Sequence, residues 1–143
     1  MELEIIKSGY TDFRSYNKIR VIPSGVEFPS ESFETISHKK ASHPGIDIVF
    51  IGRIEKDKGI FETLDAFSTL SKKHKNIKLH ILGEGSRLSE LSNKYKSKRI
   101  IFHGFVNRSL LAKILEESSI FCLPSSSESF GNSVVEAMAF GVV

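Results

Sequence analysis

The sequence predicts an α/β domain built on a doubly wound parallel sheet. Four short segments are almost continuously apolar, as is typical of strands covered on both faces. Segments with apolar residues at helical spacing lie between them, and the connections are only a few residues long. This alternation favours a Rossmann-like sheet with helices on both faces and right-handed crossovers. The expected strands span residues 46–51, 77–82, 100–102 and 120–123.

Each expected helix carries apolar residues that recur every three or four positions. These stripes lie within residues 60–70, 88–95, 110–115 and 130–141. Asn107 is a suitable N-terminal cap for the third of these helices, because its side chain can accept a hydrogen bond from the first turn.

The first third of the chain lacks a sustained period, and we interpret residues 1–45 as a junction segment and linker. It contains one strand-like piece, Lys18–Pro23. Residues 28–44 are rich in Ser, Glu, His and Lys, which predicts a surface connection that ends at the Pro-Gly pair of positions 44 and 45. The folded domain is then expected over residues 46–143.

The last three residues, Gly141–Val143, resemble the start of a fifth strand. A sheet of Rossmann order places further strands beside the fourth one, and their loss would leave that strand as an unprotected edge. We therefore expect the domain to be truncated at its C-terminus.

The net charge of +3 is too small to predict a nucleic-acid partner. Basic residues are nevertheless concentrated between Lys72 and Arg99, where nine of them accompany two acidic residues, Glu84 and Glu90. These lysines and arginines alternate with polar residues. A solvated face is one interpretation of this stretch, and a membrane-facing surface is the other.

Cys122 is the single cysteine, so no disulfide can form within the chain, which suits a reducing compartment. No apolar run approaches the ~20 residues that a membrane-spanning helix needs. The N-terminal sequence Met-Glu-Leu-Glu also lacks the basic flank of a signal peptide. We therefore expect a cytoplasmic location.

Ligands of open α/β sheets bind beyond the carboxyl ends of the strands, close to the switch point between strands one and four. The loop after the first strand carries Arg53, Lys58 and Gly59. An arginine can hold phosphate oxygens through two parallel hydrogen bonds, and a lysine adds a point charge beside it. The alternative is that both cations are surface residues paired with Glu55 and Asp57.

The loop after the fourth strand leads into the last helix at Gly131 and Asn132. Helix N-termini bind anions readily, because their backbone N–H groups lack partners within the helix. Glu128 precedes this turn and Glu136 follows it, and a carboxylate can accept the paired hydroxyls of a sugar. The alternative is that Glu128 is a helix-start acid and Glu136 a solvated helix residue.

Several other classes of site are disfavoured. The histidines at 38, 43, 74, 80 and 103 show no metal-ligand spacing, so we expect no metal. The serines at 125, 126, 127 and 129 lack the Gly-x-Ser-x-Gly elbow of serine hydrolases. The Gly83-Glu-Gly85 motif lacks the third glycine of a dinucleotide fingerprint and follows the second strand, so we expect no nicotinamide cofactor, and no cofactor of another kind.

Taken together, four segments resemble the donor-binding domain of the retaining glycosyltransferases called group 1 or family 4, which have two Rossmann-like domains in the GT-B fold. Residues 20–27 resemble the Val-Ile-Pro-Asn-Gly-Val-Asp segment, and residues 50–59 the Gly-Arg-…-Lys-Gly loop. Residues 82–85 match the Gly-x-Gly after the second strand. The most specific match is residues 128–141, which carry the Glu-(seven residues)-Glu signature in register with Phe, Gly, Ala, Met, Ala and Gly.

The resemblance implies a role for each candidate residue. Arg53 and Lys58 would bind the diphosphate of the donor, and Glu136 would accept the ribose hydroxyls. Glu128 would be the catalytic contact to the donor sugar. The neighbouring contacts to the sugar and phosphate would come from Ser129, Phe130, Gly131 and Asn132, and the base pocket would be lined by Gly104 and Phe105.

Some positions depart from the family's usual residues. The family usually has Asn at the position of Ser24, Asp at Glu27, Pro at Ser86 and Asp at Ser119. None of these four residues is one of the proposed contacts. Val143 is the larger departure, because the family usually has a proline there.

The resemblance implies a hexosyltransferase that uses a UDP- or GDP-linked sugar, retains the anomeric configuration and needs no divalent metal. The acceptor domain would precede residue 1, and the full-length enzyme would contact the inner membrane face peripherally. Without the acceptor domain, the chain is expected to bind the donor but not to turn over. The alternative is a non-catalytic regulatory module that binds a nucleotide sugar.

Overall fold

The computed structural model describes residues 25–26, 29–128 and 130–143. The expected strand at Lys18–Pro23, most of the family-like segment at 20–27, and Ser129 lie outside these residues. None of the described helices is both long enough and apolar enough to cross a membrane.

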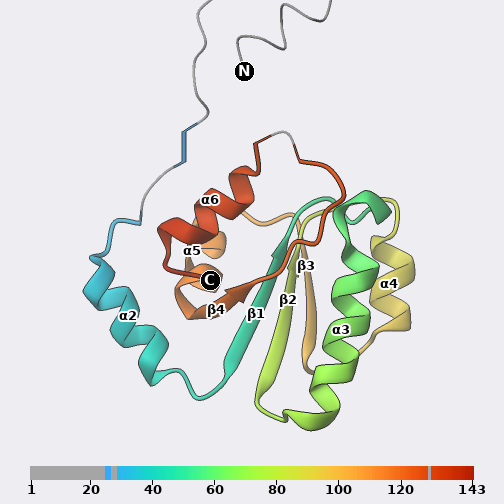
Figure 1. The fold of residues 1–143 in the computed structure, drawn as a ribbon, viewed down its shortest axis with the longest axis horizontal. Helices are drawn as coiled ribbons and strands as arrows, with labels where there is room; N and C mark the ends of the chain where they lie inside the picture. The colour runs from blue at the N-terminus through green and yellow to red at the C-terminus, as the bar shows by residue number, and fades with distance from the viewer. Residues whose placement is uncertain (1–24, 27–28, 129) are drawn as a thin grey trace, which may run out of the picture.

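Four parallel strands form one sheet in the order β3-β2-β1-β4, as the alternating pattern predicts (Figure 1). The strands are β1 (Ile46–Ile51), β2 (Ile77–Leu82), β3 (Ile100–Gly104) and β4 (Ser118–Phe121). The first two match their predicted bounds, and β3 extends two residues further than expected. The predicted start of β4 at residue 120 is wrong by two residues, because Ser118, fully buried and bonded to the carbonyl of Ile114, already pairs with β1.

Helices cover both faces of the sheet, which confirms the doubly wound architecture (Figure 1). On one face lie α3 (Ile60–Lys73) and α4 (Leu88–Lys94); on the other lie α2 (Phe33–Ser42), α5 (Arg108–Glu117) and α6 (Asn132–Ala139). A separate apolar core fills each side. Phe50 of β1 belongs to the α3 side and Val49 to the other, because successive side chains of a strand point to opposite faces.

The prediction of a surface connection before Pro44 is wrong, because α2 occupies residues 33–42. Ser32 caps this helix by accepting a hydrogen bond from the backbone N–H of Thr35 at 3.3 Å. Ile36 is 1% exposed and packs into the second core. Lys40 donates to the carbonyl of Leu115 at 2.8 Å, at the end of α5. A single buried apolar residue gives no helical period, so the pattern could not reveal the helix.

The residues after α6 pack beside β4, where the sequence places the start of a fifth strand. Val142 is 3% exposed. The N–H of Phe121 donates to the carbonyl of Val143 at 2.6 Å, and the N–H of Val143 donates to the carbonyl of Ser119 at 3.2 Å. This alternating pair of bonds is the pattern expected of a neighbouring parallel strand.

Two glycines bring the loops at the carboxyl ends of the strands close together. Gly83 has φ of 136°, and a side chain there would collide with the carbonyl oxygen of Gly52. Gly59 has φ of 73°, and a side chain there would collide with the carbonyl oxygen of Pro124. Because a positive φ is strained for any residue with a Cβ, both approaches depend on glycine.

A polar cluster lies on the α2 side of the sheet. Asp47 of β1 is 2% exposed, and its Oδ2 lies 3.0 Å from Nε2 of His80. The other ring nitrogen of His80 lies 3.0 Å from Nε2 of His103, and the two rings are stacked. His43 completes the cluster, with Nε2 at 3.4 Å from Asp47 Oδ2. These histidines, which lack a spacing pattern in sequence, converge only in the folded chain.

Candidate functional site

The loops after β1 and β4 meet at the carboxyl edge of the sheet, as the strand order predicts. Lys58 lies at the end of the short 3₁₀ helix η2 (Lys56–Lys58). Its ammonium donates to Glu128 Oε1 at 2.8 Å and to the carbonyl of Ser127 at 2.9 Å. The N–H of Ser126 donates to the carbonyl of Asp57 at 2.9 Å. Side-chain and backbone bonds therefore hold the two loops together.

The ion pairs differ in part from the alternative pairing considered for Arg53 and Lys58. Arg53 is paired with Asp57, as that alternative has it, at 2.9 Å between Nη2 and Oδ2. Lys58 is paired with Glu128 instead of Glu55 or Asp57. Glu55 accepts hydrogen bonds from the N–H and hydroxyl of Ser86, which lower the pKa of its carboxyl group.

The hydrogen bond from Lys58 also lowers the pKa of Glu128 below its ordinary value. A further bond from Ser125 acts in the same direction. Glu128 is therefore ionised at neutral pH and can only accept hydrogen bonds. Its side chain is 32% exposed and that of Lys58 is 14% exposed, so the pair remains open to a ligand from solution.

The loop after β4 leads from Glu128 directly to the start of α6. Gly131 caps the helix with φ of 75°, and a glycine has no side chain that could satisfy the first N–H groups. Phe130 is 52% exposed beside it, and Asn132 is the first residue of the helix. The structure thus places Glu128, Phe130, Gly131 and Asn132 around one turn.

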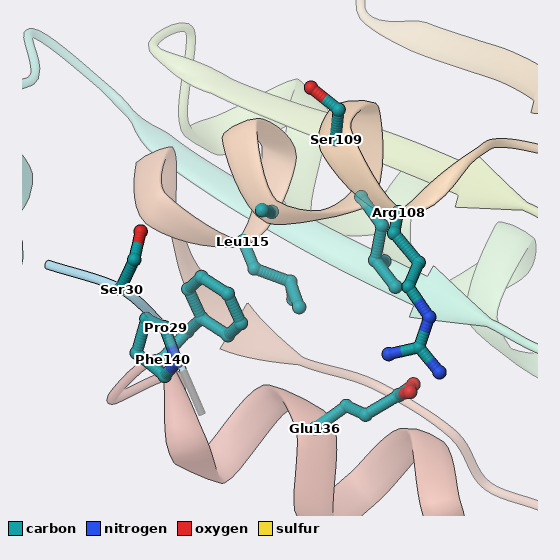
Figure 2. A pocket seen from close by; sticks show the side chains of 9 residues that line it. Pro29, Ser30, Arg108, Ser109, Leu115, Glu136 and Phe140 are labelled. Carbon is teal, nitrogen blue, oxygen red and sulfur yellow. The ribbon is translucent and has the colours of Figure 1, made fainter. Parts of the chain in front are cut away.

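Glu136 lies further along α6, away from the Lys58–Glu128 pair. Its carboxylate points toward the guanidinium of Arg108 on α5 (Figure 2). Both side chains line a pocket of about 300 Å³, together with Leu111, Leu115 and Phe140. Glu136 is half-buried and faces this hollow, where its carboxylate remains within reach of a ligand.

A second pocket of about 330 Å³ opens at the ends of β1 and β2. Arg53 and Phe105 line it, and Leu111 lines both pockets, so the two hollows adjoin. Gly104 ends β3 with φ of 66°, and its carbonyl accepts the N–H of Gly83 at 2.8 Å. Phe105 is 79% exposed and directly follows this turn.

The arrangement suits an extended anionic ligand with a polar end. Lys58 and Glu128 lie beside a helix start, and the adjoining hollows are lined by Arg53 and by the carboxylate of Glu136. Within the described part of the chain, no group of three or more His, Cys, Asp or Glu side chains is arranged to hold a metal ion.

Residues 32–143 match the family model of the glycosyl transferases of group 1. The chain belongs to this family. The match includes both loops described above and all of α6, so the group 1 assignment covers the whole candidate site.

Related proteins agree with this group 1 assignment. The chain is 26% identical over 158 residues to mannosylfructose-phosphate synthase of Agrobacterium fabrum, which covers 99% of this chain and 34% of that protein. The C-terminal domain of a group 1 glycosyl transferase from Francisella tularensis is 28% identical, with a TM-score of 0.60 over 80% of this chain and 66% of that domain. TarM of S. aureus, solved with UDP, has a TM-score of 0.69 at 22% identity, over 98% of this chain and 26% of that one.

The group 1 chain spans between 34% and 40% of the length of the curated relatives that it matches first. Its fold is that of the Rossmann-like domain of GT-B glycosyltransferases.

Sequence reasoning missed one prominent residue of the site. Arg108 begins α5 and lines the pocket of Glu136 from the opposite side (Figure 2). The available signal was its place directly after the cap residue Asn107, whose side chain accepts from the N–H of Leu110 at 2.9 Å. A residue at the first turn of a crossover helix lies at the carboxyl edge of the sheet, where ligands bind.

Proposed function

We propose that this chain is the donor-binding part of a retaining glycosyltransferase that transfers a hexose-type sugar from UDP or GDP to an acceptor. The observation that carries the proposal is the meeting of Lys58 and Glu128 at the start of α6, beside two adjoining hollows. Family membership supports a transferase, and the related TarM structure contains UDP.

In this proposal the diphosphate replaces the internal partners of the two cations. The Arg53–Asp57 pair is largely exposed, and the Lys58–Glu128 pair is partly exposed. An exposed ion pair such as Arg53–Asp57 contributes only about 0–1 kcal/mol, so its exchange costs little. Charge-assisted hydrogen bonds to the diphosphate contribute roughly 1.5–3 kcal/mol each.

Release of Lys58 gives Glu128 its catalytic role in this scheme. The ionised carboxylate then accepts hydroxyls of the donor sugar, while the first N–H groups of α6 bind the phosphate next to it. The leaving diphosphate gains negative charge as the glycosidic bond breaks, and Arg53 and Lys58 stabilise that charge without a metal. Phe130, Gly131 and Asn132 supply the turn that surrounds the sugar, and Ser129 is a further contact that the family resemblance implies.

The remaining parts of the nucleotide occupy the hollows. Glu136 accepts the ribose hydroxyls, with Arg108 positioned opposite. The base lies past β3, against Gly104 and the exposed ring of Phe105.

Titration calorimetry with UDP and GDP, in the presence of EDTA, tests the diphosphate assignment. Arg53→Ala and Lys58→Ala should each weaken binding by about tenfold to a hundredfold, because each removes a charge-assisted hydrogen bond. Lys56→Ala is the matched control, since Lys56 is an exposed cation of the same turn. Unchanged affinity in the first two variants would overturn the assignment.

The ribose assignment has its own test. Glu136→Ala should weaken UDP and GDP but hardly change the affinity for free pyrophosphate, which has no ribose. Equal losses for nucleotide and pyrophosphate would mean that Glu136 acts through helix stability or general charge.

A further inference from the structure

The end of the domain opposite the donor loops is strongly basic. We define the basic pole as eight residues at the ends of α3 and α4 and at the starts of β2 and β3. They are Lys72, Lys73, Lys75, Lys78, Lys94, Lys96, Lys98 and Arg99. The parallel strands begin at this end, which lies at the bottom of Figure 1, whereas the loops of Arg53 and Glu128 follow the strand ends.

Specific contacts bring these cations into one surface. Arg99 donates from Nη1 to the carbonyls of Ser71 at 2.9 Å and His74 at 3.1 Å, which ties the start of β3 to the end of α3. Lys75, Lys78 and Arg99 also line a hollow of about 170 Å³. Two segments, the start of β2 and the start of β3, thus present positive charge to the same hollow.

Few acidic groups offset this charge. The sequence contains no Asp or Glu between residues 66 and 83, nor between residues 91 and 115. Asp47 lines the hollow as well, but its side chain is 3% exposed and its carboxylate lies against His80 and His43. The exposed surface of the basic pole is therefore dominated by ammonium and guanidinium groups.

Apolar side chains are exposed at the same end. Ile46, the first residue of β1, is 41% exposed, and Leu70, in the last turn of α3, is 44% exposed. Exposed apolar residues among lysines suit the boundary between lipid headgroups and acyl chains. The surface is less suited to stacking of nucleic-acid bases, because its tyrosine already has partners. Lys94 lies 5.2 Å from the ring centre of Tyr95, and the hydroxyl of Tyr95 is bonded to Asp65.

We propose that the basic pole docks this chain on a membrane surface rich in anionic phospholipids. The lysines and Arg99 bind the headgroup phosphates, and Ile46 and Leu70 enter the interface between them. A strand of six residues is roughly 20 Å long, so the donor loops would face the aqueous phase at about that distance from the membrane. The proposal does not depend on the identity of the sugar donor.

Co-sedimentation with vesicles tests the proposal. The chain should bind vesicles of equal parts phosphatidylglycerol and phosphatidylcholine, but not vesicles of phosphatidylcholine alone. Added salt should weaken the binding, because it screens exposed charges. Each basic residue near such a surface strengthens binding by about fivefold, so Lys75→Glu/Lys78→Glu should lower the partition coefficient by at least about 25-fold.

The matched control is Lys56→Glu/Lys113→Glu, which changes net charge equally at two exposed lysines outside the basic pole. It should bind the vesicles nearly as well as the unmodified chain, and Leu70→Gln should bind several-fold more weakly. Circular dichroism and thermal unfolding check that each variant folds.

Three results would overturn the proposal. Equal losses in the two double variants would mean that net charge alone drives the binding. Displacement from vesicles by millimolar inorganic phosphate would identify the hollow as a site for a small free anion. Loss of binding to a single-stranded RNA in Lys75→Glu/Lys78→Glu, with vesicle binding unchanged, would identify a nucleic-acid surface.

Discussion

Lys58 and Glu128 are separated by 70 positions in the chain, and their 2.8 Å contact leaves the candidate site nearly neutral without a ligand. Arg53 and Asp57 cancel one another in the same way. In the proposed function a diphosphate binds by exchange of partners, so that each cation keeps a hydrogen-bond acceptor throughout. The same exchange favours a ligand that carries both a diphosphate and a sugar, because the released Glu128 carboxylate then needs a new hydrogen-bond donor, which a sugar hydroxyl supplies.

This exchange predicts opposite effects of Glu128→Gln on two ligands. UDP without a sugar should bind more tightly, because Lys58 no longer has to leave an ion pair with a carboxylate. The matching UDP-sugar should bind more weakly, because a neutral amide accepts sugar hydroxyls less strongly than a carboxylate does. Parallel calorimetric titrations measure both affinities, and a shift of both in the same direction would contradict the exchange.

The Asp47 cluster predicts a dependence of stability on pH. Burial lowers the pKa of His103 below its ordinary value of 6.5, and the charge of His80 acts in the same direction. As the pH falls below 6.5, the unfolded chain takes up a proton before the folded chain does, so the free energy of unfolding decreases. The pKa of Asp47 is also lowered, against the effect of its burial, by its hydrogen bond with His80, so the loss continues in acid.

Urea unfolding between about pH 7.5 and pH 5 should show this decrease, and His103→Gln should make it shallower. His38→Gln serves as the control, because His38 is an exposed residue of α2. A slope that is the same in both variants would exclude His103 as its source.

Among the helices, α2 depends on few contacts, and Ile36 is the residue that anchors it. This side chain is 1% exposed among the residues of the second core. Ile36→Ala should lower the free energy of unfolding by about 2–4 kcal/mol, since it leaves a cavity that the surroundings fill only in part. Chemical denaturation measures the change, and His38→Ala on the exposed side of the same helix should cost far less. Similar losses in both would mean that helix propensity, and not burial, holds α2 in place.

The elements differ in how well the sequence predicts them, and the reason is where their apolar residues point. β1 and β2 are covered on both faces, so their apolar runs coincide with their bounds. β4 breaks this rule, because Ser118 is fully buried while Ile120 is 39% exposed. In α2 only Ile36 is buried, so no stripe marks the helix.

The candidate site is likewise predictable from the sequence only in part. Parallel strand order brings the loops of Lys58 and Glu128 to one edge, and that much is predictable from the sequence. Which acid pairs with which cation depends on side-chain conformations and on the loop paths at Gly59 and Pro124. This pairing cannot be predicted from the sequence. Arg108 and Glu136 face each other only because α5 and α6 lie on the same side of the sheet.

The chain as a whole is expected to bind a donor without transferring its sugar. In the family that it resembles, the acceptor lies on the other domain, and the chain covers 34% to 40% of the length of its first relatives. Positioning of two reactants contributes roughly 7–11 kcal/mol in favourable cases, and the contacts proposed for the described residues are contacts to the donor. Water would also screen Arg53 and Lys58 in an open site.

Incubation of the chain with radiolabelled UDP- and GDP-sugars, and with lipid, sugar or protein acceptors, measures transfer directly. The Arg53→Ala/Glu128→Ala double variant sets the background. Transfer well above that background would refute the expectation and would require an acceptor site within residues 1–45.

The close approach of Gly59 to Pro124 has a consequence for protein engineering. Substitution of Gly59 would strain the backbone and push the two loops apart, so no other residue fits at this position. The walls of the two hollows are different, since Phe105 and Leu111 present side chains that can change size without moving a loop. A mutant library that aims to change nucleotide preference should therefore diversify these walls, together with Arg108, and hold Gly59 fixed.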